Sequence, residues 1–168
     1  HATTSSTYEK AMRQRQAALA TGNADPGLLS VLERQMAESG VAVAAARRSM
    51  VAALAQGYAS LRSGPFPSAL LALEGQLETA LETQPAAEVE DAFTDALARG
   101  RRRDQEVGRA LAGPHRSDFL VTHGEKAQAA RLCSTGEQKA LLIGLVLAHA
   151  AARQSAEGVP LVLLLDEV

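Results

Sequence analysis

Two polar segments near the carboxyl end of the 168-residue chain carry residue types suited to nucleotide chemistry. Residues 134–139, Ser-Thr-Gly-Glu-Gln-Lys, run directly into an apolar stretch of helical length. The segment VPLVLLLDEV (159–168) reads as a buried strand that ends on Asp166 and Glu167. A helix start with glycine and serine offers N–H and O–H donors to an anion. Carboxylates after such a strand can hold magnesium and deprotonate water. Together the segments predict a phosphate site.

Each segment also has a purely structural explanation. Ser134 and Glu137 fit a capping box, in which the serine accepts a helical N–H and the glutamate reaches back to the serine. Asp166 and Glu167 fit a polar turn that ends an ordinary strand. From the residues themselves, both explanations stay open for both segments.

The remaining pattern predicts a mainly α fold with a small β component. Alanine and leucine dominate, and aromatic residues make up only 3%. Asp25 can cap a long helix whose first residue is Pro26, and Gly40 is a place where that helix could bend. The helix after residue 134 has almost no polar face, so we expect it to be buried. The expected helices cover 8–20, about thirty residues from 26, 87–111 and 135–154. Strands are expected over 159–165 and, between two turns, within 113–128; the segment near 66–76 fits either a strand or a helix, and its glycine and the two prolines before it favour the strand.

These elements suggest two parts. Residues 1–112 are expected to form a helical arm, with long helices that could pair antiparallel and a short strand near 66–76. Residues 113–168 are expected to combine a helix with a buried strand. The net charge is −2, so a nucleic-acid contact would need a local patch. The N-terminus lacks a secretory pattern and the longest apolar run is short of the ~20 residues of a membrane span, so we expect a cytoplasmic protein.

Three separated motifs resemble the RecF family of recombination mediators, which are ABC-type ATPases related to SMC proteins. They are GPHRSD (113–118), STGEQKALLIGLVLAHA (134–150) and LLLDEV (163–168), and YEKAMRQRQ (8–16) resembles the helical arm of that family. The resemblance implies that Ser134 and Gly136, with Glu137 and Gln138, form the signature that contacts the γ-phosphate of ATP held by the opposite subunit. It also implies that Asp166 binds Mg²⁺ and Glu167 is the catalytic base.

The chain lacks a Walker A motif, because none of its three lysines follows a glycine. We therefore expect the helical arm of such a protein in residues 1–112 and its carboxy-terminal α/β ATPase-lobe segment in residues 113–168, inactive alone, with Walker A upstream of His1. For the intact protein the resemblance implies ATP-dependent homodimerisation and ATP-dependent binding to gapped duplex DNA in repair and replication restart. It also implies cooperation with RecR and RecO in loading RecA.

Other features carry weaker predictions. The arginines of residues 99–103 could contact DNA phosphates or form a solvated helix face; they are Arg99, Arg101, Arg102 and Arg103. His115 and Arg116 could support the ATPase lobe or belong to a tight turn. Alternative readings of the chain are another SMC-like or RecN-like ATPase, or a non-catalytic helical interaction module.

Overall fold

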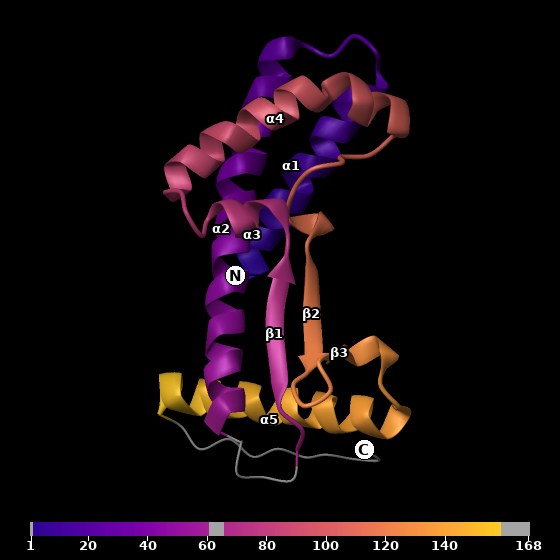
Figure 1. Ribbon diagram of the computed structural model, residues 1–168. Helices are drawn as coiled ribbons and strands as arrows, with labels where there is room; N and C mark the ends of the chain where they lie inside the picture. The colour runs from indigo at the N-terminus through magenta and orange to yellow at the C-terminus, as the bar shows by residue number, and fades with distance from the viewer. Residues whose placement is uncertain (1, 61–65, 159–168) are drawn as a thin grey trace. The chain divides into compact units, whose positions relative to one another are not determined.

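The computed structural model describes residues 2–60 and 66–158 (Figure 1). These residues form mainly helix, together with a small sheet in the order β1-β2-β3, so the predicted fold class is confirmed. The elements are α1 (Ala2–Ala20), α2 (Pro26–Ser60), β1 (Ala69–Glu74), α3 (Gln76–Ala80), α4 (Ala86–Val107), η1 (Pro114–Arg116), β2 (Asp118–His123), β3 (Gln128–Ala129), η2 (Ala130–Leu132) and α5 (Thr135–Glu157).

Strands β1 and β2 of the described sheet fall in segments predicted as strands, whereas β3 was not predicted. The strand expected near 66–76 is β1, and β2 pairs antiparallel with β3, with Thr122 opposite Ala129. The strand expected over 159–165 lies outside the described residues. Helix α4 ends earlier than the predicted residue 111, because Gly108 adopts a left-handed conformation (φ 75°) that terminates the helix.

Helix α2 begins as its sequence predicts. The carboxylate of Asp25 accepts the N–H groups of Gly27 and Leu28 at 3.0 and 3.3 Å, and Pro26 takes the first helical position. The 35-residue helix is therefore roughly 50 Å long. Gly40 is a packing position: a Cβ there would lie 3.2 Å from both the Tyr8 and the Phe93 rings.

The chain forms two compact units, within residues 1–48 and 74–118 (unit 1) and within 49–73 and 119–168 (unit 2). Helix α2 therefore contributes to both. These units do not follow the expected division at residue 112, since 49–73 belong with the carboxy-terminal segment and 113–118 with the helices. The division into arm and ATPase lobe stays a prediction about function.

Unit 1 has an apolar core that is built around a buried ionic centre. The core includes Tyr8, Met36, Phe93 and Leu97. Arg15 of α1 lies where this helix meets α2 and α4, and it is only 1% exposed.

The guanidinium of Arg15 satisfies its donors on three sides. It donates to Glu33 Oε1 at 3.0 Å, to Asp104 Oδ2 at 2.7 Å and to the Leu97 carbonyl at 2.7 Å. Asp104 also accepts the Leu111 N–H at 3.0 Å, and Glu33 receives a second guanidinium from Arg101. These ion pairs and hydrogen bonds join α1, α2 and α4 at one point.

Unit 2 relies on close helix contact. Gly57 of α2 and Gly144 of α5 leave no room for a side chain: a Cβ at Gly57 would lie 2.4 Å from the Ala148 carbonyl oxygen, and one at Gly144 would lie 2.3 Å from the Tyr58 hydroxyl. Buried Leu54, Tyr58, Leu141 and Ala148 surround these contacts. The predicted full burial of α5 is wrong for Leu142, which is 59% exposed. Only one face of α5 packs against α2, and the described elements do not cover the face that carries Leu142.

We predict that Arg15→Met destabilises the chain by about 3–5 kcal/mol, because it leaves two buried carboxylates short of their shared cation. Arg13→Met on the same helix is the matched control. Its side chain is 67% exposed and makes one exposed pair with Glu9, so its cost should stay below about 0.5 kcal/mol. Urea unfolding followed by circular dichroism compares the two. Equal losses would contradict a central role for Arg15.

Candidate functional site

The segment 134–138 forms the start of α5, and its capping box is complete. Ser134 Oγ accepts the Glu137 N–H at 3.5 Å, and Glu137 Oε2 accepts the Ser134 N–H at 2.9 Å. The Ser134 hydroxyl also donates to Glu137 Oε2, at 2.8 Å. Because both groups of Ser134 meet the same oxygen, Glu137 fixes the orientation of the serine.

Glu137 is held from its other side by Lys126. The Lys126 ammonium forms an ion pair with Glu137 Oε1, so the two carboxylate oxygens have separate partners. The Lys126 ion pair and the Ser134 hydrogen bonds hold the pKa of Glu137 down at about 2. The same contact raises the pKa of Lys126. Glu137 is therefore a carboxylate, and Lys126 an ammonium, throughout the neutral range.

The other two predicted contact residues differ in their surroundings. A Cβ built on Gly136 would meet nothing within 4 Å, so the approach to the helix start is open there. The first α5 bond along the chain runs from the Gln138 N–H to the Ser134 carbonyl at 2.9 Å. The N–H groups of Thr135 and Gly136 precede it and point out of the helix end. The Gln138 side chain instead donates to the Cys133 carbonyl at 3.0 Å.

These features fit an anion such as a phosphate. A 23-residue helix contributes the positive end of its dipole, and an open glycine lets a ligand approach the backbone closely. The serine hydroxyl adds a donor once it turns away from Glu137. Asp166 and Glu167, predicted to supply metal binding and the base, lie outside the described residues. No group of three or more potential metal ligands occurs among the described residues.

The GPHRSD segment (113–118) belongs to unit 1 and fastens its helices together. His115 Nδ1 lies 2.8 Å from the Tyr8 hydroxyl, and His115 Nε2 lies 3.0 Å from the Ala110 carbonyl oxygen. Burial raises the pKa of Tyr8 well above its usual value. Since the Ala110 carbonyl can only accept, Nε2 donates to it, and in the neutral tautomer of the ring Nδ1 then accepts from the Tyr8 hydroxyl. Gly113 is required next to it, because its φ is 133° and a Cβ would lie 2.2 Å from the Tyr8 hydroxyl.

Further contacts extend this fastening to α2 and α3. Arg47 donates to the Pro114 carbonyl, and the Ser117 hydroxyl donates to Glu78 at 2.7 Å. Arg116 is exposed. The structure therefore supports the tight-turn interpretation of this segment.

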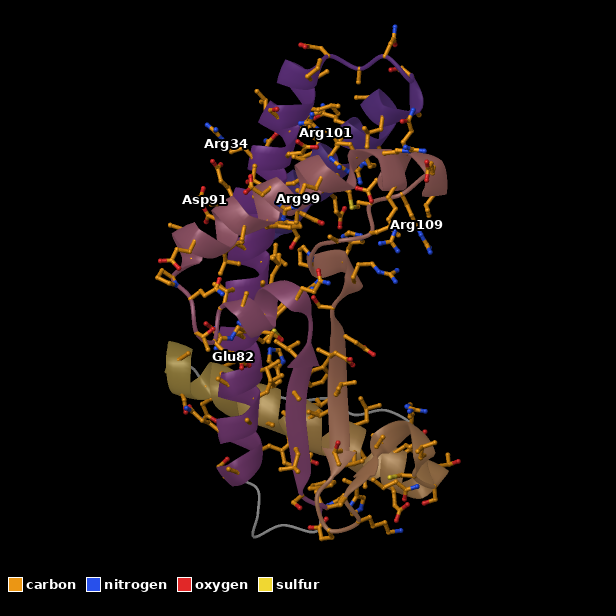
Figure 2. All side chains as sticks on the ribbon, turned by 45° about the horizontal axis from the view of Figure 1, so that its top comes forward. Arg34, Glu82, Asp91, Arg99, Arg101 and Arg109 are labelled. Atoms are coloured by element: carbon orange, nitrogen blue, oxygen red, sulfur yellow. The ribbon has the colours of Figure 1, made fainter. Side chains whose placement is uncertain are left out.

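The four arginines of α4 have different surroundings; Figure 2 labels two of them, Arg99 and Arg101. Arg101 lies against α2, where it holds the buried Glu33 at 2.5–2.9 Å and the Ser30 hydroxyl at 3.1 Å. The hydrogen bond to Glu33 raises the pKa of Arg101 further. Arg101 is thus part of the ionic centre of unit 1.

The other three arginines are exposed. Arg99 and Arg102 make only exposed pairs, 3.9 and 2.9 Å long, with acidic residues one turn away on α4. Arg103 makes no ion pair within the described part of the chain. These guanidinium groups can therefore meet an external anion, whereas that of Arg101 is already engaged.

Several residues of this arrangement escaped the sequence analysis. Lys126 is the main one: it lies eleven positions before Glu137, and only the return of the chain through β3 and η2 brings the two together. Arg15 and Glu33 were likewise missed, because a charged residue in a helix is usually predicted to face solvent.

Within residues 2–60 and 66–158, the helices include no candidate for a membrane span.

Comparison with known proteins shows which relatives the chain is similar to. The chain is 52% identical over 162 residues to "DNA replication and repair protein RecF" of Mesorhizobium japonicum, covering 96% of the chain and 43% of that relative. It is 48% identical to the protein of the same description from Brucella abortus, covering 42% of that relative. It is 47% identical to the protein of the same description from Rhizobium rhizogenes, covering 45% of that relative. The chain thus spans less than half the length of the curated relatives it matches.

Solved structures show the same fold. A structure described as the recombination mediator protein RecF-ATP in the RecFOR pathway superposes with a TM-score of 0.84 at 19% identity, over 98% of this chain and 44% of that one. A second, described as RecF-ATPrS, gives a TM-score of 0.80 at 17% identity. No protein-family model matches the chain.

The described residues have the fold of a class of proteins in which helices are joined to part of an ABC-type ATPase fold. Within that class, the chain belongs to the RecF family over the segment that it spans.

We predict that acid weakens the start of α5 through Glu137. The folded pKa of this carboxyl, about 2, lies below the usual 4.5, so its stabilising effect is complete above pH 4.5 and is lost as the pH falls towards 2. The difference in unfolding free energy between the wild type and Glu137→Gln should therefore shrink over this range. Parallel urea titrations at several pH values measure it. A difference that stays constant with pH would contradict the ionised cap.

Proposed function

We propose that this chain supplies the signature half of an ATP site that closes between two subunits of the full-length protein. The observation that supports it most strongly is the start of α5, where a fixed serine hydroxyl stands beside the unobstructed Gly136. Ser134 and Gly136 contact the γ-phosphate held by the opposite subunit, and Glu137 and Gln138 hold the segment in place. The solved relatives of the same fold are described with ATP and ATPrS.

The chemical step belongs to the two carboxylates at the end of the sequence. Asp166 binds Mg²⁺, which neutralises charge on the phosphates, and Glu167 takes the proton of the attacking water.

The biological role follows the relatives, which are described as DNA replication and repair proteins. The ATP-bound dimer binds gapped duplex DNA and works with RecR and RecO in loading RecA. Within this chain, Arg99, Arg102 and Arg103 are the exposed cations of α4 that can neutralise DNA phosphates. Arg101 is left out of that role because it neutralises Glu33.

We predict that Ser134→Arg blocks ATP-driven dimerisation of the full-length protein, because an arginine side chain fills the space of the γ-phosphate. ATP binding by the monomer should survive, since Walker A lies elsewhere. Light scattering with and without ATP, together with a nucleotide-binding assay, measures both.

Ser134→Ala is the matched control for the cap. It removes the hydroxyl without adding bulk and should cost about 1 kcal/mol of stability. If Ser134→Arg shows only a similar loss of stability and dimerises normally, Ser134 is a helix cap and nothing more.

We predict that Glu167→Gln in the full-length protein keeps ATP binding and loses about 10²–10⁴-fold in hydrolysis rate, so that an ATP-bound dimer accumulates. Asp166→Asn should instead weaken magnesium and nucleotide binding together. Phosphate release and nucleotide binding, measured side by side, separate the two effects. Normal hydrolysis by Glu167→Gln would show that Glu167 is not the base.

A further inference from the structure

The turn between β2 and β3 carries two neighbouring residues of opposite charge, and each is engaged on a different element of unit 2. Glu125 Oε1 accepts the Ser68 N–H at 3.0 Å, just before β1, and Glu125 Oε2 lies 3.1 Å from His123 Nδ1. Lys126 points the other way, to Glu137 at the start of α5. The turn therefore links the beginning of β1 to the segment 134–138.

Glu137 poses an electrostatic problem for phosphate binding at Ser134. Its carboxylate holds both the N–H and the O–H of that serine through a single oxygen. A γ-phosphate that approached Ser134 would meet a like charge within a few ångströms, and a hydroxyl whose proton is already donated. In the open solvent near a helix end such repulsion is moderate, but it acts directly at the contact.

Lys126 offsets that charge from the side away from Ser134. It occupies Oε1 and leaves Oε2 to the serine. Gln128, two residues further on, donates to the Leu132 carbonyl at 3.0 Å and fixes the chain that returns to α5. Lys126 is therefore presented to Glu137 by a turn that is anchored at both ends.

We propose that Lys126 is a positioning residue for γ-phosphate recognition: by neutralising Glu137 it keeps the start of α5 attractive to an anion and allows the Ser134 hydroxyl to turn to the phosphate. The proposal rests on the function proposed above. Lys126 acts through Glu137 and does not itself touch ATP. Lys126 should therefore no longer be required when Glu137 is replaced by a neutral side chain.

The test is a double-mutant cycle in the full-length protein, read as the ATP concentration that gives half-maximal dimerisation. Lys126→Gln should raise that concentration roughly 3- to 10-fold, because the uncompensated carboxylate repels the phosphate. Glu137→Gln keeps the capping box, since glutamine serves at this position. Combined with Lys126→Gln, it should restore the value to within about twofold of wild type.

Lys139→Gln is the matched control. Lys139 is an exposed lysine of the same helix start, and its loss removes the same charge without touching Glu137. It should leave the half-maximal concentration within about twofold of wild type. Melting curves of the two lysine variants, Lys126→Gln and Lys139→Gln, at neutral pH should lie close together, because an exposed ion pair contributes little to stability.

Two results would overturn the proposal. One is an unchanged ATP requirement in Lys126→Gln. The other is a double variant as impaired as Lys126→Gln alone, which would mean that the lysine binds phosphate itself or acts only through the fold. The variant Ser134→Arg, measured in parallel, distinguishes a failure of the proposed role of Lys126 from a failure of the proposed function. If Ser134→Arg dimerises normally with ATP, the proposed function fails; if it is blocked while Lys126→Gln is normal, only the role of Lys126 fails.

Discussion

The burial of Arg15 is the constraint on which unit 1 depends. A guanidinium that is 1% exposed cannot be left without partners, so the carboxylates of Glu33 and Asp104 and the Leu97 carbonyl must lie around it. Those partners come from α2 and α4, which fixes the register of both helices against α1. Apolar packing alone tolerates sliding, whereas a planar group with directed donors does not.

The segment GPHRSD makes a second set of hydrogen bonds, which join α1, α2 and α3. The Tyr8 hydroxyl and His115 connect α1 to this segment, and Arg47 and Glu78 connect α2 and α3 to it. The segment continues directly into β2, the strand that precedes the Lys126 turn. Residues that resemble a family motif thus serve in this chain first as a structural junction, with Gly113 chosen for its backbone angle and its lack of a side chain.

In unit 2, the mainly apolar helix α5 begins with a polar segment. Gly57 and Gly144 allow α2 and α5 to approach closely, and this contact leaves the first turn of α5 exposed. The capping box satisfies the helix end and keeps the Ser134 hydroxyl at an exposed position. The structural and functional explanations of Ser134 are compatible, because a cap that can release its hydroxyl is also a donor to phosphate.

The sequence by itself determined the local features. Asp25 and Pro26 start α2, Ser134 and Glu137 start α5, and the motifs led to the family. Such signals depend on residues a few positions apart, so they can be read along the chain.

Only the tertiary structure decided which charges are buried or paired at a distance. Arg15 and Asp104 are 89 positions apart. The sequence left Arg101 open to a DNA contact or a solvated helix face, whereas in the fold it binds Glu33. Nothing in the spacing of Lys126 and Glu137 distinguishes a partner from a solvated lysine. The reason is physical: burial and ion pairing depend on which elements pack together, and that packing is set by the whole chain.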